Sequence, residues 1–237
     1  TEPGNWLAHG RTFSEQRFSP LTQIDASNVV RLAPAWVYAT GETRGHEATP
    51  LVVDGVMFVT LPFSLVVALD AATGKQVWKT YTMEEPKMVG KNSAGTPQWK
   101  PAGAAIWTSP TIDEAKNAIY VATGNAYTTP AAATSDAVIA LDMTTGAIRW
   151  VQQATPNDTF VIGCKPGVAP CPDEVGPDFD FGNAPILRTL PGGRRVLSLG
   201  QKSGMVWGLA PDENGKVLWQ YRAGKGSALG GIEWGSA

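Results

Sequence analysis

Two aspartates in the segment "PDFDFG" are spaced so that both carboxyl groups could act at one site. Asp178 and Asp180 stand two positions apart, and on an extended segment such side chains point the same way. They could therefore share one cation, which would keep both carboxyl groups ionised. The alternative interpretation is a pair of solvated loop carboxylates.

Three other side chains could take part in the same kind of site. Asn125 in "VATGNAY" offers an amide oxygen, which is a fair ligand for Ca²⁺, although Gly-Asn is also ordinary hairpin-turn chemistry. Trp107 in "GAAIWTSP" offers a flat apolar ring preceded by small residues, although a Trp on a strand is more commonly a core residue. Lys202 in "GQKSG" offers a cation, or else an ordinary surface charge.

A repeated phrase predicts the elements that must position these residues. "VALDAATGKQVW" ends at Trp78, "IALDMTTGAIRW" ends at Trp150, and a looser copy, "GLAPDENGKVLW", ends at Trp219. Thr-Gly or Asn-Gly between two apolar runs is typical of a tight hairpin, because Gly accepts a positive φ and Asp or Asn bonds its own backbone. Each copy therefore indicates a strand, a turn and a second strand ending in Trp.

Each repeat holds four strand candidates, which predicts an all-β fold of four-stranded antiparallel propeller blades. The repeated Trp would sit on the outermost strand of a blade and pack on the neighbouring blade. The predicted parts are an N-terminal segment with a closing strand (1–45), three blades (46–82, 105–151 and 183–223) and two long loops (83–104 and 152–182). Three blades cannot close a ring, so we expect an open arc completed by missing sequence or by a second copy.

The composition and the two cysteines bear on the cellular compartment of the protein and on the classes of molecule that it could bind. The 237 residues carry a net charge of −2, which gives no reason to propose nucleic acid or an anionic membrane as a partner. No apolar run is long enough to span a bilayer, and no basic-then-apolar leader is present, as expected of a cytosolic or a mature secreted protein. Cys164 and Cys171 in "CKPGVAPC" form a poor zinc site, and a loop-closing disulfide, which favours an oxidising compartment, is the preferred interpretation over two free thiols.

Longer motifs resemble a known family. "WLAHGRTFSEQRFSPLTQIDASNV" and "ALDAATGKQVW" resemble the start of the pyrroloquinoline quinone (PQQ) dependent alcohol dehydrogenases, which are eight-bladed propellers. The first blade is similar to the methanol and ethanol dehydrogenase branch, whereas "GPDFDFGNAPIL", "GQKSG" and "GGIEWGSA" resemble polyvinyl alcohol dehydrogenase. The resemblance covers almost the whole chain but only about half of the eight blades.

The resemblance implies a role for each candidate residue. It implies that Trp107 stacks on PQQ, that Glu47 in "GHEATP" and Lys202 contact PQQ, that Asn125, Asp178 and Asp180 bind the metal, and that Asp178 is the catalytic base. Asp180 matches an extra acidic position that some lanthanide-using members employ as a ligand. Asp158 in "TPNDTF" is the alternative base, but the Trp-Asp that follows such a motif in the methanol branch is replaced here by "TFVI".

The implied function is oxidation of an alcohol, with secondary or polymeric alcohols favoured, by PQQ and Ca²⁺ in a periplasmic or secreted protein. Since no Cys-x-x-Cys-His occurs, electrons would pass to an external acceptor such as a cytochrome c. The family's metal-binding Glu and its adjacent-cysteine disulfide are not found in this sequence. A propeller fragment or binding module without the cofactor is therefore the alternative.

Overall fold

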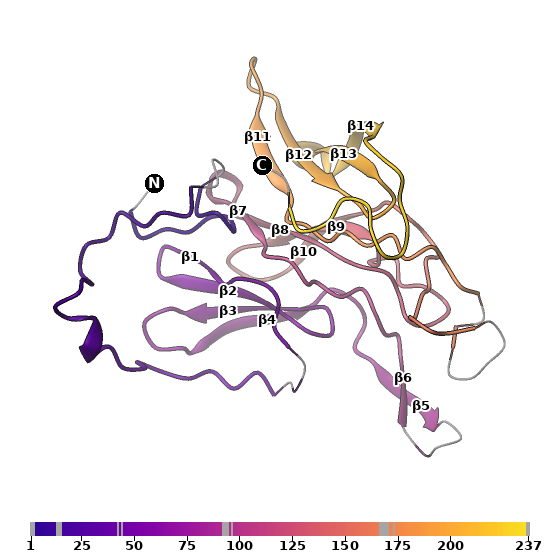
Figure 1. Cartoon of the computed structure of the whole chain (residues 1–237), viewed down its shortest axis with the longest axis horizontal. Helices are drawn as coiled ribbons and strands as arrows, with labels where there is room; N and C mark the ends of the chain where they lie inside the picture. Colours follow the sequence, from indigo (N-terminus) through magenta and orange to yellow (C-terminus); the bar gives the residue numbers. More distant parts are fainter. Residues whose placement is uncertain are drawn as a thin grey trace.

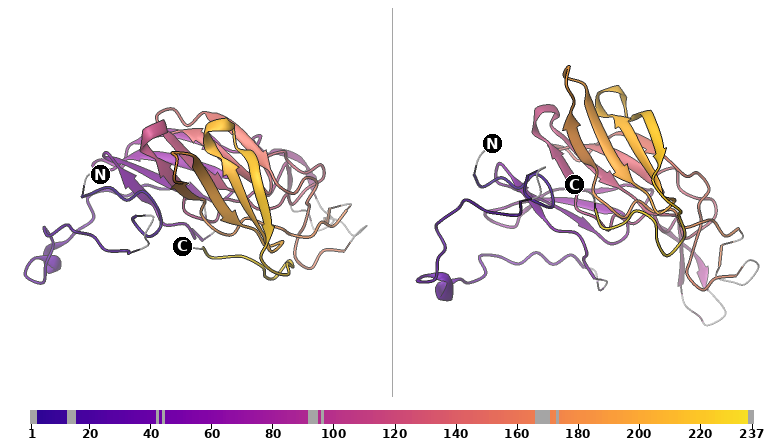
Figure 2. Two further views of the ribbon diagram at one scale, coloured as in Figure 1. Left: turned by 90° about the horizontal axis from the view of Figure 1, so that it is seen from above. Right: turned by 45° about the horizontal axis from the view of Figure 1, so that its top comes forward.

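The computed structural model describes residues 3–12, 16–41, 43, 45–91, 95, 97–165, 171–172 and 174–235. Within them the chain forms three four-stranded antiparallel sheets and one two-stranded hairpin, so the all-β prediction is confirmed. The three sheets stand side by side in chain order, like part of a fan (Figures 1 and 2). In the described part of the chain, no helix has the length and apolar character needed to cross a membrane.

The strands of each sheet follow one another in the order of the sequence. The first sheet contains β1 (Leu51–Val53), β2 (Val56–Leu61), β3 (Leu65–Asp70) and β4 (Gln76–Tyr81). The second contains β7 (Thr111–Asp113), β8 (Ala118–Ala122), β9 (Ala137–Asp142) and β10 (Ile148–Gln153). The third contains β11 (Ile186–Thr189), β12 (Arg195–Gly200), β13 (Met205–Ala210) and β14 (Lys216–Arg222). Short 3₁₀ turns lie at η1 (Val29–Arg31), η2 (Glu114–Lys116) and η3 (Pro211–Glu213).

Apolar side chains join neighbouring sheets face to face. One buried cluster combines Leu51 and Phe58 of the first sheet with Ile119 of the second. Another combines Tyr120 of the second sheet with Leu197 of the third. Successive residues of a strand face opposite sides, so β8 sends Ile119 into one cluster and Tyr120 into the other. This is why the middle strands are continuous apolar runs, as in a sheet buried on both faces.

The repeated phrase is explained by contacts between blades. The Asp that precedes the turn in this phrase caps the turn, since Asp70 Oδ1 accepts hydrogen bonds from the Thr73 backbone N (2.8 Å) and Oγ1 (2.7 Å). A Cβ added to the turn glycine Gly146 would lie 2.6 Å from Cε3 of Trp78, the Trp of the preceding blade. Trp78 Nε1 also donates to the Met143 carbonyl at 3.0 Å. Trp78 therefore packs on the turn of the next blade, as predicted.

The same contact recurs elsewhere in the arc. Trp150 lies 2.6 Å from the Cβ position of Gly215 in the third sheet, and Trp36 of the N-terminal segment lies 2.5 Å from that of Gly74 in the first. The turn must lack a Cβ at these points, so the repeat requires its Gly for packing as well as for its positive φ.

Two expectations are corrected by the structure. Residues 33–40 ("APAWVYAT"), predicted as a closing strand, form no strand, because the segment is attached through side chains and has no ladder partner among the described residues. Residues 83–104, predicted as a long loop, contain the hairpin of β5 (Lys87–Lys91) and β6 (Pro97–Lys100), which projects from the sheets in Figure 1. All of β5 is exposed, so its sequence has no apolar alternation that could reveal a strand.

A buried ion-pair cluster connects the second and third sheets. Arg195 at the start of β12 donates to Asp113 Oδ2 at 2.6 Å and pairs with both oxygens of Asp212 (2.6 and 2.9 Å). Asp113 is 3% exposed and also accepts a hydrogen bond from the Tyr120 hydroxyl at 2.9 Å. Arg195 therefore fixes the relative position of two blades.

Candidate functional site

The segments that lead into the first strand of each blade meet at one place. "EATP" (47–50) precedes β1, "WTSP" (107–110) precedes β7, and "GNAP" (182–185) precedes β11. Their first residues, Glu47, Trp107 and Gly182, line a common hollow of about 300 Å³. The repeat therefore brings positions far apart in the sequence to one centre.

A second, larger hollow of about 800 Å³ shares part of this lining. Four of the predicted site residues lie on its wall, namely Glu47, Trp107, Asp180 and Lys202. Asn125 and Asp178 do not line it, but both contact residues that belong to the same cluster of polar side chains. The structure thus brings the candidate residues into one neighbourhood.

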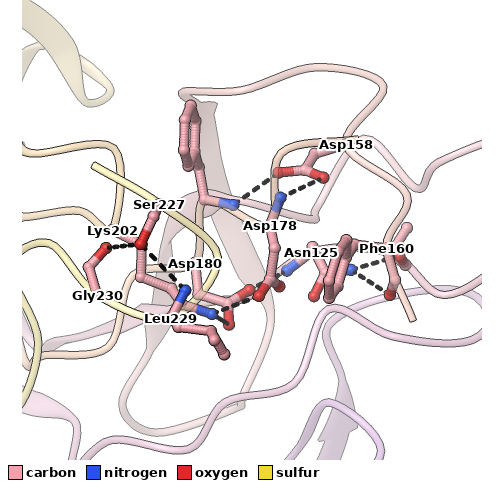
Figure 3. A network of polar contacts seen from close by, with 11 residues as sticks. Asn125, Asp158, Phe160, Asp178, Asp180, Lys202, Ser227, Leu229 and Gly230 are labelled. Carbon is pink, nitrogen blue, oxygen red and sulfur yellow. Dashed lines mark hydrogen bonds and ion pairs between the residues drawn. The ribbon is translucent and has the colours of Figure 1, made fainter. Parts of the chain in front are cut away.

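Lys202 is the centre of the cluster (Figure 3). Its ammonium donates to Asp178 Oδ2 at 2.7 Å and to Asp180 Oδ2 at 3.0 Å. The three residues are between 7% and 9% exposed, so Lys202 is not a surface charge and the aspartates are not solvated loop carboxylates. In this structure the cation that the two aspartates share is the lysine ammonium, and Asp178 is in a left-handed conformation rather than the extended one that the spacing argument assumed.

Local turns place these three residues. Lys202 follows β12 in a hairpin that closes on Gly204 (φ +77°), and its backbone N donates to the Asp180 carbonyl at 3.0 Å. Asp178 adopts a left-handed conformation (φ +62°), which Asp tolerates better than most residues. These turns hold both backbones in positions from which the side chains can pair.

Asp158, the alternative base, anchors the segment that carries Asp178. Its Oδ1 accepts from the Asp178 backbone N at 3.1 Å, and its Oδ2 accepts from the Phe179 backbone N at 2.7 Å (Figure 3). Asp158 is 1% exposed, and burial raises its pKa while these two hydrogen bonds oppose the rise. Its carboxylate is therefore occupied by the backbone, which fits a positioning role better than proton abstraction.

Asn125 is held in one orientation by its surroundings. Its backbone N donates to Asp180 Oδ1 at 2.7 Å, and its amide nitrogen donates to the carbonyls of Ala126 (2.7 Å) and Phe160 (2.8 Å). Both amide hydrogens are thereby engaged, which leaves the amide oxygen as the atom able to bind a cation. A Cβ on the preceding Gly124 would lie 2.6 Å from Asp180 Oδ1, so this approach requires Gly.

Burial and charge shift the titration of the cluster. Burial raises the pKa of Asp178, while the hydrogen bond from Lys202 opposes the rise and the charge of Asp180 reinforces it. Burial alone would lower the pKa of Lys202, but the two aspartates outweigh it and the pKa is raised. Lys202 therefore remains an ammonium, and Asp178 is a stronger proton acceptor than an exposed Asp.

Asp136, immediately before β9, was missed by sequence analysis. It is fully buried, and neither carboxyl oxygen has a hydrogen-bond partner among the described residues. Burial, reinforced by the charges of Asp158, Asp180 and Asp178, raises its pKa to about 9, so it is a neutral acid at pH 7. An Asp before a strand resembles a turn residue in sequence, and no pattern signals its burial.

Trp107 and Glu47 form the outer part of the site. Trp107 is only partly buried, with its ring meeting Trp234 edge to face at a centroid distance of 5.1 Å and an interplanar angle of 77°. Glu47 is exposed at the margin of both hollows. Among the described residues, no three His, Cys, Asp or Glu side chains converge closely enough to hold a metal by themselves.

The predicted disulfide is present. Cys164 and Cys171 are bonded, with their Cα atoms 5.3 Å apart, in the loop between β10 and β11. The bridge closes a short loop whose residues 166–170 lie outside the described part.

The family model and the relatives that match this chain are all described as alcohol dehydrogenases. The family model described as "PQQ: Glucose/ethanol/alcohol dehydrogenase, beta-propeller domain" matches residues 6–95 and 83–163. A polyvinylalcohol dehydrogenase from Pseudomonas sp is 49% identical over 173 residues, which are 73% of this chain and 27% of that protein. The quinohemoprotein alcohol dehydrogenase ADH IIB from Pseudomonas putida is 42% identical over 166 residues, covering 70% of this chain and 21% of that protein.

A solved structure, quinohemoprotein alcohol dehydrogenase ADHIIG from Pseudomonas putida, aligns with a TM-score of 0.44 at 22% identity, over 93% of this chain and 48% of that one. The chain spans about a quarter of the length of the two curated relatives.

Proposed function

The chain belongs to the PQQ-dependent alcohol dehydrogenase family of β-propellers, and we propose that it supplies the cofactor platform and the proton acceptor for oxidation of an alcohol to a carbonyl compound. The observation that carries the proposal is the buried contact of Lys202 with two aspartates at the wall of a hollow that also exposes Trp107. Buried ionisable groups with shifted pKa values beside a concave site are typical of catalytic centres.

The residues present fit a flat, anionic quinone. The hollow of about 800 Å³ is within the usual range for small-molecule sites, one wall is an indole ring, and another carries an ammonium. When bound, PQQ supplies the two-electron oxidant. In this proposal Trp107 gives it a flat apolar surface, Lys202 donates hydrogen bonds to its oxygens, and Glu47 contacts its edge.

The residues also provide oxygen donors of the kind that Ca²⁺ or a lanthanide takes. The amide oxygen of Asn125 and the carboxylates of Asp178 and Asp180 would hold the cation, which would polarise the alcohol oxygen. Asp178 would accept the hydroxyl proton, because burial raises its pKa and makes it a better base. Asp158 keeps this carboxylate in place through the backbone of residues 178 and 179.

The substrate proposed is a secondary or polymeric alcohol, since two relatives at 49% identity are named polyvinylalcohol dehydrogenases. The electron acceptor proposed is an external protein such as a cytochrome c. A periplasmic or secreted location is supported by the Cys164–Cys171 disulfide.

A non-catalytic propeller fragment or binding module that has lost the cofactor site is the second candidate. It is favoured by the observation that no three acidic, His or Cys side chains of the described part converge as a metal cage. The two candidates differ in retention of PQQ and in turnover, which can be measured separately.

The test begins with incubation of the purified chain with PQQ and Ca²⁺, followed by desalting and an absorbance spectrum. We expect quinone absorbance to stay with the wild type and with K216M, which removes an exposed lysine, and to be lost from K202M. Equal retention by K202M and K216M, or loss from the wild type, contradicts the proposed site.

Turnover of a secondary alcohol with a dye acceptor then separates the two aspartates. D178N should keep PQQ but lower kcat by 100-fold or more, in the range of a lost general base, roughly 10²–10⁴. If D180N abolishes turnover while D178N does not, the base is Asp180 instead. Failure of the wild type to retain PQQ, together with absence of turnover, supports the second candidate.

A further inference from the structure

The loop between β10 and β11 is held together by hydrogen bonds close to the site. Residues 158–160, here called the strap, lie on the limb of this loop that leaves β10, and residues 174–178 form the limb that returns. Gly176 N donates to the Thr159 carbonyl at 2.7 Å, and the Thr159 hydroxyl donates to the Glu174 carbonyl at 2.6 Å. These bonds continue the contact that the Asp158 carboxylate makes with the backbone of residues 178 and 179.

The strap is also attached to the segment of Asn125. Ala126 N donates to the Asp158 carbonyl at 3.0 Å, and Phe160 N donates to the Ala126 carbonyl at 2.9 Å. These two bonds pair Ala126 with Thr159 as a parallel bridge. The Phe160 carbonyl accepts the hydrogen bond from the Asn125 amide nitrogen (Figure 3). One short piece of backbone therefore contacts both the segment of Asn125 and the returning limb.

The strap and the returning limb are closely packed. A Cβ on Gly176 would overlap Asp158 Oδ1 and would lie 2.8 Å from Thr159 N, so this approach requires Gly. Thr159 is 3% exposed and Asp158 is 1% exposed. Because water has little access to these two residues, the hydrogen bonds that they make have no ready substitute.

The Cys164–Cys171 disulfide joins the same two limbs farther along the loop. Cys164 follows the strap in the chain, and Cys171 precedes the returning limb. Their covalent bond holds the two limbs together, with Cα atoms 5.3 Å apart, whatever the arrangement of the residues between them. None of the catalytic roles proposed above involves Thr159 or this disulfide.

We propose that Thr159 is a positioning residue, and that the strap, closed by the Cys164–Cys171 disulfide, holds Asp178 at a fixed place relative to Asn125. The catalytic part of this inference rests on the proposed function, in which both residues act on one alcohol. A base must lie within hydrogen-bond reach of the proton that it accepts, and a misplacement of about 1 Å can lower a rate by about 100-fold. A strap that contacts both segments would maintain this geometry.

The first measurement is amide hydrogen exchange of Asp178 and Phe179 in the purified chain without PQQ. T159V keeps the shape of the side chain and removes its hydroxyl, so it should raise exchange at these amides by between roughly 2-fold and 13-fold, as expected for one lost hydrogen bond. T159S should restore the wild-type rate, because it keeps the hydroxyl. T80V is the matched control, since the Thr80 hydroxyl also donates to a carbonyl, that of Gly146 at 2.8 Å, at a contact between two other segments.

The second measurement is turnover of a secondary alcohol after loading with PQQ and Ca²⁺, which separates positioning from general stability. T159V should keep PQQ but lower kcat by between roughly 3-fold and 100-fold, because its base is displaced. T159S should recover the wild-type kcat, and T80V should leave kcat unchanged. The variant C164S/C171S, which opens the covalent closure, should change both exchange and kcat in the same direction as T159V.

The outcomes distinguish this inference from the function on which it rests. If exchange at Asp178 and Phe179 rises no more in T159V than in T80V, the strap does not hold Asp178, and the inference fails while the proposed function stands. If exchange rises but kcat of the loaded protein does not fall, Thr159 has no positioning role in catalysis. If the wild type does not retain PQQ, the proposed function fails, and the exchange rates still decide whether the strap holds Asp178.

Discussion

Replacing Asp136 with Asn tests the interpretation that a buried carboxyl group is kept neutral beside the Lys202 cluster. The substitution keeps the size of the side chain and removes its ability to ionise. Both Asp136 oxygens are buried and lack a hydrogen-bond partner among the described residues, and its pKa is raised from 3.8 to about 9. The variant should therefore differ from the wild type in the pH dependence of its stability.

The sign and size of the expected difference in stability between the wild type and D136N follow from proton linkage. Between pH 4 and pH 9 the folded protein holds a proton on Asp136 that the unfolded chain has lost. The contribution of Asp136 to stability is thus fully present below the unfolded pKa and is lost as the pH rises toward the folded pKa. One pH unit corresponds to about 1.4 kcal/mol, so between pH 5 and pH 8 the free energy of unfolding of the wild type should fall by about 4 kcal/mol relative to D136N.

The assay is urea unfolding of both proteins at pH 5, 6, 7 and 8 in EDTA, so that no divalent cation titrates with the cluster. The control is D25N, because Asp25 is exposed and its pKa is lowered by hydrogen bonds from Ser27, so its difference from wild type should be flat over this range. A D136N difference that is equally flat would refute the reasoning, since it would mean that a partner stabilises the Asp136 charge.

Two other substitutions test the contacts between blades, both by urea unfolding. Arg195→Met should lower the free energy of unfolding by about 3–5 kcal/mol, because it leaves the buried carboxylate of Asp113 without its ion-pair partner. Arg194→Met, on an exposed side chain, should change it by less than about 0.5 kcal/mol. Similar losses in the two variants would contradict a stabilising role for the buried ion pair. Gly146→Ala should lower the free energy of unfolding by about 1–3 kcal/mol more than Gly55→Ala does. Both glycines have a positive φ (+74° and +77°), but only Gly146 contacts the Trp78 ring. Equal losses in the two variants would exclude a packing role for Gly146.

The fold could be predicted because its signals are local and repeated. The Asp70 cap on Thr73 lies within four residues, and the same phrase recurs wherever a blade ends. The Trp that follows could be assigned to the next blade because an apolar residue at a fixed place in each repeat needs a fixed partner. Cys164 and Cys171 could be paired because they are close in sequence and have no other partner.

Features that depend on tertiary context were not predictable. β5 is exposed throughout, so it has no apolar alternation. The segment 33–40 has the composition of a strand, but a strand also requires a ladder partner, which the described residues do not provide. Burial of Asp136 and the contact of Trp234 with Trp107 arise only when blades distant in sequence are brought together.

The candidate site is best understood from the way in which four buried carboxyl groups are compensated around one lysine. Asp136 retains its proton, Asp158 accepts two backbone hydrogen bonds, and Asp178 and Asp180 share the ammonium of Lys202. Only the last pair is compensated by a charged side chain, the ammonium of Lys202. A divalent cation held by Asp178 and Asp180 would take over this compensation and release the ammonium toward another acceptor in the hollow. Under the proposed function, the same residues would form a stable ion pair without metal and would free the lysine for the oxygens of a ligand when the metal is bound.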